Sequence, residues 1–459
     1  MSSRTTIAAI ATPAGRGGVG IVRVSGEASR AILERLVPDW PDDTPSHHLR
    51  LCRICDLEGE LIDESLAVLM AGPNSYTGED VVEFQCHGGP IILRRVLDAA
   101  LEAGARIAEP GEFTRRAFLN GRLDLTQAEA VADLVNATSE SAHRLALEHL
   151  QGSLGDEIRR LVDVLMEAIV LVEAAIDFSH EEHVYQIEAD EVGRRLEEVH
   201  RCLSDLREKF DRGRRQREGV RVVILGPTNA GKSTLFNALH GTDRAIVTNV
   251  AGTTRDFLEE ELHLGATAIR LIDTAGLRAT ADRVESIGIA RSRELGSEAD
   301  LVIWVVDRSA GFGDEDRAHL TQLADAQRPT MVIINKMDRA DRFNDEDRRL
   351  LKRFDYRFET NLDADPPQGL EAVIDGIEEI AAGLSSGEGV LLSRARHLQG
   401  VVEALESLDR AQQGLEMRME HELIAIDLRD ALDALGQITG RIDTEDILER
   451  IFSDFCVGK

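Results

Sequence analysis

The stretch Gly226-Pro227-Thr228-Asn229-Ala230-Gly231-Lys232-Ser233-Thr234 fits the pattern G-x-x-x-x-G-K-[ST] in full. A largely apolar run, Val220 to Leu225, precedes it and predicts a buried strand, and the segment from Thr234 to His240 predicts the start of a helix. Strand, glycine-rich loop and helix together are the context of a phosphate-binding loop. Its backbone N–H groups and the positive end of the helix dipole would face a phosphate, with Lys232 on the β- and γ-phosphates and Ser233 on Mg²⁺.

Two further motifs follow apolar runs. Asp273-Thr274-Ala275-Gly276 comes after Ile269 to Ile272, where a carboxylate can hold Mg²⁺ through water and the N–H of Gly276 can meet a γ-phosphate. Asn335-Lys336-Met337-Asp338 comes after Met331 to Ile334. Asp338 can accept two hydrogen bonds from N1–H and N2–H₂ of guanine, a pair that adenine does not offer, so the motif predicts GTP rather than ATP.

Between these motifs, Thr253-Thr254 can complete the Mg²⁺ shell when a γ-phosphate is present, which makes this loop a switch. The position after Gly276 holds Leu277, which cannot orient an attacking water. Glu285 is the nearby candidate for catalysis, although a solvated helix residue explains it equally well. A guanine-binding loop of the Ser-Ala-Lys type is not visible, because the chain reads Glu359-Thr360-Asn361-Leu362 after its strand.

The composition limits the protein class. With 459 residues, the chain should hold two to four domains, and no apolar run approaches membrane-spanning length. A net charge of −30 argues against broad non-specific binding to nucleic-acid phosphates, and a salt or solubility adaptation explains the excess. Five cysteines in a chain of this length are typical of a reducing cytoplasm rather than a disulfide framework.

The hydrophobic period changes along the chain and predicts a multidomain α+β protein. Residues 1–121 are predicted as mixed α/β, with a hairpin-like loop at Gly15 to Gly20. Residues 122–216 and 385–459 have a helical period, and 217–384 alternate strands and helices as in a parallel sheet. One helical-bundle domain with the P-loop α/β domain inserted into it explains this order. The basic run 211–217 is predicted as a linker.

Further motifs accompany the phosphate-loop set: Ala11-Thr12-Pro13, Gly15 to Gly20, Gly72 to Asp80, Cys86-His87-Gly88-Gly89-Pro90, Pro110 to Thr114, Leu123 to Ala130, Ala174 to Phe178 and Phe455-Cys456-Val457-Gly458-Lys459. Together they resemble the MnmE, or TrmE, family of tRNA-modification GTPases. The resemblance covers the whole chain. It implies an N-terminal domain that binds a tetrahydrofolate derivative and forms a homodimer, a helical domain, and an inserted GTPase domain.

The resemblance also implies an activity. With an FAD-dependent partner, in a heterotetramer, such a protein modifies C5 of the wobble uridine, position 34, of certain tRNAs. It takes the carbon from 5,10-methylene-tetrahydrofolate, of which 5-formyl-tetrahydrofolate is an analogue. Its GTPase domains dimerise when K⁺ binds at the phosphates, and hydrolysis drives a conformational change rather than the carbon chemistry.

By position, the resemblance implies these site residues. Nucleotide-binding residues are Asn229, Ala230, Gly231, Lys232, Ser233, Thr234, Thr248, Asn249, Val250, Ala251, Gly252, Thr253, Thr254, Asp273, Thr274, Ala275, Gly276, Asn335, Lys336 and Asp338. Mg²⁺ ligands are Ser233 and Thr254; K⁺ ligands are Asn229, Thr248, Val250 and Thr253. Glu285 would be catalytic, orienting the attacking water through a second water. Folate would contact Arg23, Glu83, Arg122 and Lys459, while Cys456 is interpreted as a packing residue.

Two alternatives remain open. A ribosome-assembly GTPase would need an RNA-binding module after the GTPase domain, and residues 385–459 instead predict amphipathic helices without basic and aromatic residues interleaved. A GTP-controlled scaffold that only positions a partner enzyme is the other alternative, because no motif of the folate site follows from physical reasoning alone.

Overall fold

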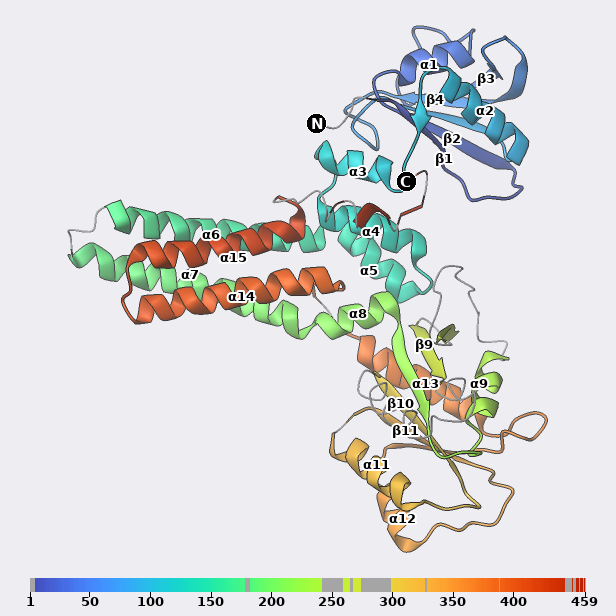
Figure 1. The fold of residues 1–459 in the computed structure, drawn as a ribbon, viewed down its shortest axis with the longest axis vertical. Coiled ribbons are helices and arrows are strands. Elements are labelled where there is room, and N and C mark those ends of the chain that lie inside the picture. The colour runs from blue at the N-terminus through green and yellow to red at the C-terminus, as the bar shows by residue number, and fades with distance from the viewer. Residues whose placement is uncertain are drawn as a thin grey trace, which may run out of the picture. The chain divides into compact units, whose positions relative to one another are not determined.

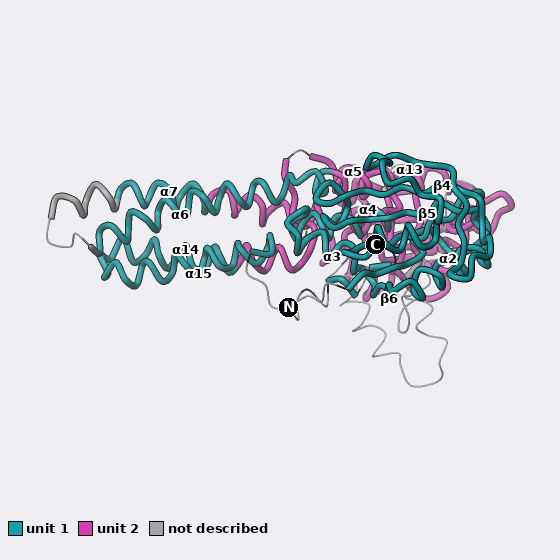
Figure 2. The backbone as a smooth tube through the Cα atoms, turned by 90° about the horizontal axis from the view of Figure 1, so that it is seen from above, with its two compact units in different colours: residues 1–135, 148–200, 403–459 teal, residues 136–147, 201–402 magenta. Residues whose placement is uncertain are grey.

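The computed structural model describes most of the chain, which divides into two compact units (Figure 2). The first unit comprises residues 1–135, 148–200 and 403–459, and the second comprises 136–147 and 201–402. The residues described are 5–177, 182–241, 259–264, 267–273, 299–326, 328–387, 389–441, 448, 451–453, 455, 456 and 458. Within these ranges, no helix combines the length and the apolar character that crossing a membrane requires.

The first unit begins with a six-stranded sheet in the order β3-β4-β5-β2-β1-β6. Its strands are β1 Ile7–Ile10, β2 Val19–Ser25, β3 Arg50–Cys55, β4 Leu61–Met70, β5 Val81–His87 and β6 Arg106–Ile107. Helices α1 (Ser29–Leu36) and α2 (Pro90–Glu102) share a buried apolar core with this sheet. Strands β1 and β2 pair antiparallel, which confirms the hairpin-like connection predicted for Gly15 to Gly20.

Alternation along β5 separates the two faces of this sheet. Phe84 and Cys86 are buried in the core with α1 and α2, whereas Glu83 and Gln85 are only partly buried. Successive side chains of a strand point to opposite faces, so Glu83 lies on the face away from that core. Arg23 of β2 is the register partner of Glu83, which brings these two charged residues together on one face.

Helices from before and after the α/β segment 217–384 pack together in the rest of the first unit (Figure 1). Helix α15 packs against α6, where Arg429 donates a hydrogen bond to Glu173 at 2.6 Å. This side-by-side arrangement is what an inserted domain requires. The helices of this region are α3 Glu112–Leu119, α4 Leu125–Asn136, α6 Ser153–Asp177 and α15 His421–Thr439, together with most of α7 Glu182–Glu208 and of α14 Ala395–Glu416; helix α5 Glu140–Leu150 falls largely in the second unit.

The second unit holds a six-stranded sheet in the order β12-β11-β10-β7-β9-β8. All neighbouring pairs are parallel except β8 with β9. The elements are β7 Val220–Leu225, α9 Lys232–His240, β8 Glu259–Leu264, β9 Thr267–Asp273, β10 Leu301–Asp307, α11 Asp314–Asp325, β11 Thr330–Asn335, α12 Asp345–Leu351, β12 Tyr356–Glu359 and α13 Leu370–Ser385. The predicted parallel sheet is therefore confirmed.

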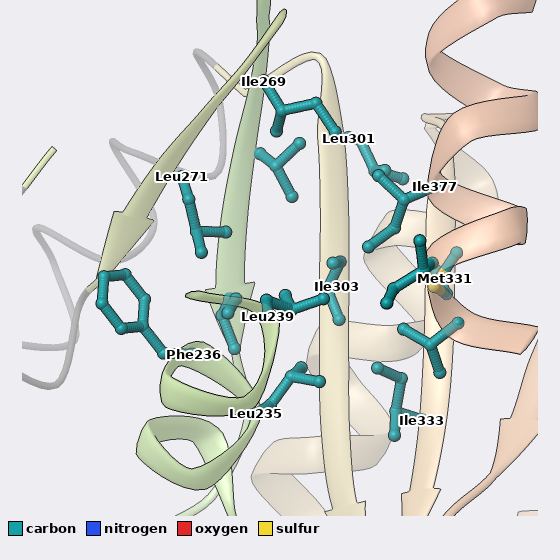
Figure 3. Packing of buried hydrophobic residues seen from close by; sticks show 14 of the residues in the cluster. Leu235, Phe236, Leu239, Ile269, Leu271, Leu301, Ile303, Met331, Ile333 and Ile377 are labelled. Atoms are coloured by element: carbon teal, nitrogen blue, oxygen red, sulfur yellow. The ribbon is translucent and has the colours of Figure 1, made fainter. Parts of the chain in front are cut away.

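Helices cover both faces of this sheet. On one face, Ile303 of β10 shares a buried cluster with Leu235 of α9 and Ile377 of α13 (Figure 3). On the other face, Trp304 lies in a cluster that includes Leu320 of α11 and Leu350 of α12. Strands buried on both faces are continuously apolar, as β10 is. The fold class is thus the predicted one, a multidomain α+β protein with an inserted P-loop α/β domain; the predicted boundaries at 121, 216 and 384 stay predictions.

The basic run predicted as a linker is helix α8 (Phe210–Glu218), and it is anchored on the sheet of the second unit. Arg214 and Arg215 donate hydrogen bonds to the carboxylate of Asp300 at 2.6 and 2.8 Å, and the backbone N–H of Arg221 donates a third. The Asp300 side chain is 4% exposed. Burial alone would raise its pKa, but these hydrogen bonds outweigh it and hold the pKa below the ordinary value.

We expect Asp300→Asn to lower the free energy of unfolding of this unit by about 3 kcal/mol at pH 7, because two partly buried guanidinium groups lose the charge that they share. Since the folded pKa lies below the ordinary 3.8, the carboxylate stabilises the fold above that value and loses this effect as the pH falls through the folded pKa. The difference in unfolding free energy between wild type and variant should therefore become smaller as the pH falls below about 4.

Urea unfolding between pH 7 and pH 3.5 measures this deficit. Asp325→Asn is the matched control, because Asp325 pairs with Arg353 while its side chain is 65% exposed. That change should cost less than about 1 kcal/mol. A deficit for Asp300→Asn that is equally small, or that grows as the pH falls, would contradict the proposed energetic role of this ion pair.

Candidate functional site: a nucleotide loop and a second charged cluster

The phosphate loop joins β7 to α9 and needs glycine at both ends. Gly226 has φ +135°, and a Cβ there would overlap the carbonyl oxygen of Val305 on the neighbouring strand. Gly231 has φ +107°, and its Cβ would overlap the side-chain amide of Asn335. Both backbone angles lie in the region that favours glycine, and neither position leaves space for a side chain. The absence of side chains at these two positions lets the loop backbone lie close to Val305 of β10 and Asn335 of β11.

Lys232, Ser233 and Thr234 form the first turn of α9. The Lys232 ammonium donates hydrogen bonds to the carbonyl oxygens of Gly226 and Pro227 at 2.9 and 2.6 Å, so it lies over the loop. The first N–H groups of a helix have no partner within it, and the helix dipole adds positive charge there. Ammonium, N–H groups and dipole together make this turn suited to bind a phosphate.

The Asn335-Lys336-Met337-Asp338 motif lies beside this loop, although about a hundred residues separate them in the sequence. The Asn335 side chain is buried, and its amide donates to the carbonyl oxygen of Ala230 at 2.9 Å. The Lys336 ammonium donates to the carbonyl oxygen of Asn229 at 2.7 Å. Asp338 is exposed at the same end of the sheet. The structure thus brings together the two motifs that the sequence assigned to one site.

Asp307, the last residue of β10, was not singled out from the sequence. Its carboxylate accepts a hydrogen bond from Lys336 at 2.6 Å, and its other oxygen accepts from the N–H and the hydroxyl of Ser309 at 2.8 and 2.6 Å. Burial alone would raise the pKa of Asp307, but these bonds outweigh it and keep the pKa below its ordinary value. The available signal was its position at the end of a buried strand, where ligand-binding residues gather.

The segment after β12 also lies at this site, although its sequence does not contain a Ser-Ala-Lys motif. Thr360 is fully buried, and its hydroxyl donates to the amide oxygen of Asn335 at 3.2 Å. The N–H of Leu362 donates to the same oxygen at 3.2 Å. From the sequence alone, base contacts by this loop were in doubt, because its residues differ from the usual motif. The contacts with Asn335 place it next to the loop that carries Asp338.

Several predicted site residues lie outside the described part of the chain. They are Thr248, Asn249, Val250, Ala251, Gly252, Thr253, Thr254, Thr274, Ala275, Gly276, Glu285 and Lys459. Asp273 is the last residue of β9, so its backbone is placed at the same end of the sheet as the phosphate loop, while its side chain is not described. The predicted roles of all these residues stay predictions.

A second charged cluster lies in the first unit. Arg23 donates a hydrogen bond to Glu83 at 2.8 Å, and their side chains are 20% and 14% exposed. The guanidinium lies over the rings of Tyr76 and Phe113, at 5.6 and 5.7 Å from the ring centres. Cation and aromatic face attract each other at these distances. Two of the predicted folate residues therefore form an ion pair. Two aromatic residues that were not predicted from the sequence contact the guanidinium of this pair.

The C-terminal segment reaches this cluster. Arg23 donates to the carbonyl oxygen of Gly458 at 3.3 Å, and Lys459 follows directly in the chain. Cys456 is exposed, so the packing role predicted for its side chain is not what the structure shows; its carbonyl oxygen accepts a hydrogen bond from the N–H of Gly111. Arg122 is exposed and lies beside Gly78, without a hydrogen bond to the Arg23 pair among the described residues.

The parallel sheet, the phosphate loop and the Asn335 motif at its strand ends define a P-loop protein of the GTPase class. Two family models match this chain: "GTP-binding protein TrmE N-terminus" over residues 6–122 and "MnmE helical domain" over residues 125–456. The chain is 45% identical to the tRNA modification GTPase MnmE of Symbiobacterium thermophilum, over 99% of each chain. It is 44% identical to that of Moorella thermoacetica, also over 99% of each, and 41% identical to that of Hydrogenovibrio crunogenus, over 100% of this chain and 99% of the relative.

This chain belongs to the MnmE family of tRNA modification GTPases. The resemblance found in the sequence motifs is confirmed, and so is the predicted enzyme class.

We expect Gly231→Ala to weaken the binding of a fluorescent GDP analogue by about tenfold or more. The new Cβ would overlap the Asn335 amide, and φ +107° is strained for alanine by about 1–3 kcal/mol. Gly383→Ala is the matched control, because nothing lies within 4 Å of a Cβ there. Unchanged affinity in Gly231→Ala would show that this loop is not the nucleotide site.

Proposed function

We propose that this tRNA-modification GTPase acts in the cytoplasm. With an FAD-dependent partner, it would modify C5 of the wobble uridine, position 34, of certain tRNAs, with 5,10-methylene-tetrahydrofolate as the one-carbon donor. The observation that carries the proposal is the joined phosphate and guanine loops in a chain that matches MnmE relatives over their whole length. Hydrolysis would drive a conformational change in a homodimer that forms a heterotetramer with the partner.

In this proposal the residues at the strand ends of the second unit bind GTP. Lys232 contacts the β- and γ-phosphates, and Asp338 accepts hydrogen bonds from the guanine. Ser233 and Thr254 would hold Mg²⁺, and Asp273 would contribute to the same site through water. The position of the Lys232 ammonium over the loop supports the phosphate assignment, and the exposure of Asp338 at the same sheet end supports the base assignment.

K⁺ would be held by Asn229, Thr248, Val250 and Thr253. Of these, the structure describes Asn229, whose side chain is exposed on the phosphate loop and offers an amide oxygen, a ligand type that K⁺ accepts. Beside the phosphates, this cation would neutralise charge that develops during hydrolysis. Leu277 cannot orient water, so Glu285 would do so through a second water.

Folate would bind at the cluster of Arg23 and Glu83, with Arg122 and Lys459. A guanidinium suits an anionic group of the ligand, and a carboxylate can accept hydrogen bonds from the N–H donors of a pterin ring. The partly exposed ion pair, whose guanidinium lies over two aromatic rings, is consistent with this use. The carbon chemistry would then take place in the first unit and GTP hydrolysis in the second.

GTP hydrolysis by the full chain should be on the order of tenfold or more faster in K⁺ than in Na⁺ buffer at equal ionic strength, because the cation supplies charge stabilisation that Leu277 and its neighbours lack. Steady-state phosphate release measures both rates. Nucleotide affinity in each buffer is the control for indirect salt effects. Equal rates in the two buffers would rule out the cation-dependent mechanism.

Titration of 5-formyl-tetrahydrofolate onto the full chain tests the second site. We expect saturable binding by the wild type and a loss of about tenfold or more in affinity for Arg23→Ala, since charge-assisted hydrogen bonds are the strong ones. Arg94→Ala is the control, because the Arg94 side chain is 82% exposed on α2. Absence of binding by the wild type would instead favour a GTP-controlled scaffold.

A further inference from the structure

The contact between Lys336 and the phosphate loop depends on a carboxylate outside both motifs. The Lys336 side chain is 12% exposed and that of Asp307 is 14% exposed, and their charged groups lie 2.6 Å apart. A largely buried ammonium is costly without a negative partner. Asp307 supplies that charge, and the same ammonium then donates to the carbonyl oxygen of Asn229.

The orientation of the Asp307 carboxylate is itself fixed. One oxygen accepts two hydrogen bonds from Ser309, which leaves the other oxygen for Lys336. Asp307 is also the register partner of Asn335, the residue before Lys336, on the adjacent parallel strand. Backbone pairing therefore brings Asp307 close to the residue that follows Asn335, and the hydrogen bond from Lys336 to the carboxylate forms across the ends of these two strands.

The hydrogen bond from Lys336 to Asn229 joins two residues whose backbones both adopt the left-handed conformation. Lys336 has φ +62° and Asn229 has φ +60°, and neither is glycine. Such left-handed residues persist where surrounding contacts hold them. At Asn229 the hydrogen bond from Lys336 is such a contact, and it lies in the middle of the phosphate loop.

We propose that Asp307 is a positioning residue of the nucleotide site: it holds the Lys336 ammonium against the carbonyl of Asn229 and so fixes the conformation of the phosphate loop. This inference rests on the proposed binding of guanine nucleotides. It means that a residue outside the recognised motifs couples the base-binding loop to the phosphate-binding loop. Asp307 itself touches neither base nor phosphate in this role.

The test uses the full chain and a fluorescent GDP analogue at equilibrium. Asp307→Asn and Lys336→Met should each weaken binding by about tenfold, because each removes a charge-assisted contact. The double variant should also be about tenfold weaker rather than about a hundredfold, since both changes break one chain of contacts. Asp341→Asn is the control, because the Asp341 carboxylate pairs with Arg308 and Arg348 instead. The nucleotide affinity of this variant should stay within about twofold of wild type.

A second readout separates positioning from a merely structural role. In nucleotide-free protein, Asp307→Asn should speed amide hydrogen exchange in residues 226–234, whereas loss of the Ser309 turn alone would speed exchange only around 307–313. Asp307→Ser replaces Asp307→Asn if thermal unfolding shows that the latter does not fold.

Four results are decisive. Binding by Asp307→Asn within about twofold of wild type, or a double variant about a hundredfold weaker, would overturn the role of Asp307. Unchanged exchange in residues 226–234 would also overturn it. If wild-type protein binds no guanine nucleotide, the proposed function itself fails, and this outcome is distinct because it precedes any comparison of variants.

Discussion

The side chain of Asn335 is the constraint on which the nucleotide end of the second unit depends. It is buried, its NH₂ donates to Ala230 in the phosphate loop, and its oxygen accepts from Thr360 and from the N–H of Leu362. One amide therefore joins three loops. Aspartate would lose the donor and glutamine would be too long, because Gly231 already lies against the amide. Loops joined in this way lose little conformational freedom when a ligand binds.

The sequence allowed the strands and the phosphate loop to be predicted, because their signals are local. Buried parallel strands are continuously apolar, and the observed β7 has the predicted bounds, Val220–Leu225. Asp307 and Thr360 could not be assigned in the same way. A carboxylate at a strand end has the same local pattern whether it is solvated or bound to Lys336, and the pairing becomes visible only when β10 and β11 lie side by side.

The basic run in α8 shows the same limit for charge. A run of arginines is usually a solvated face, and an interpretation as a linker follows from that expectation. In the structure, Arg214 and Arg215 instead share Asp300, which lies more than eighty residues further along the chain. Gln216 also donates to the carbonyl oxygen of Ser385 at 2.6 Å, at the end of α13. The segments that enter and leave the inserted domain are thus fastened to each other, so the junction is an ordered part of that unit.

Gly458, near the C-terminal end of the chain, shows a structural requirement that local sequence patterns do not reveal. Gly458 has φ +98°, and a Cβ there would lie 2.6 Å from the carbonyl oxygen of Ile10. Any side chain would therefore push the segment off β1 and away from Arg23, which donates to the Gly458 carbonyl. The requirement comes from an approach between residues at opposite ends of the chain, a distance that no local pattern encodes.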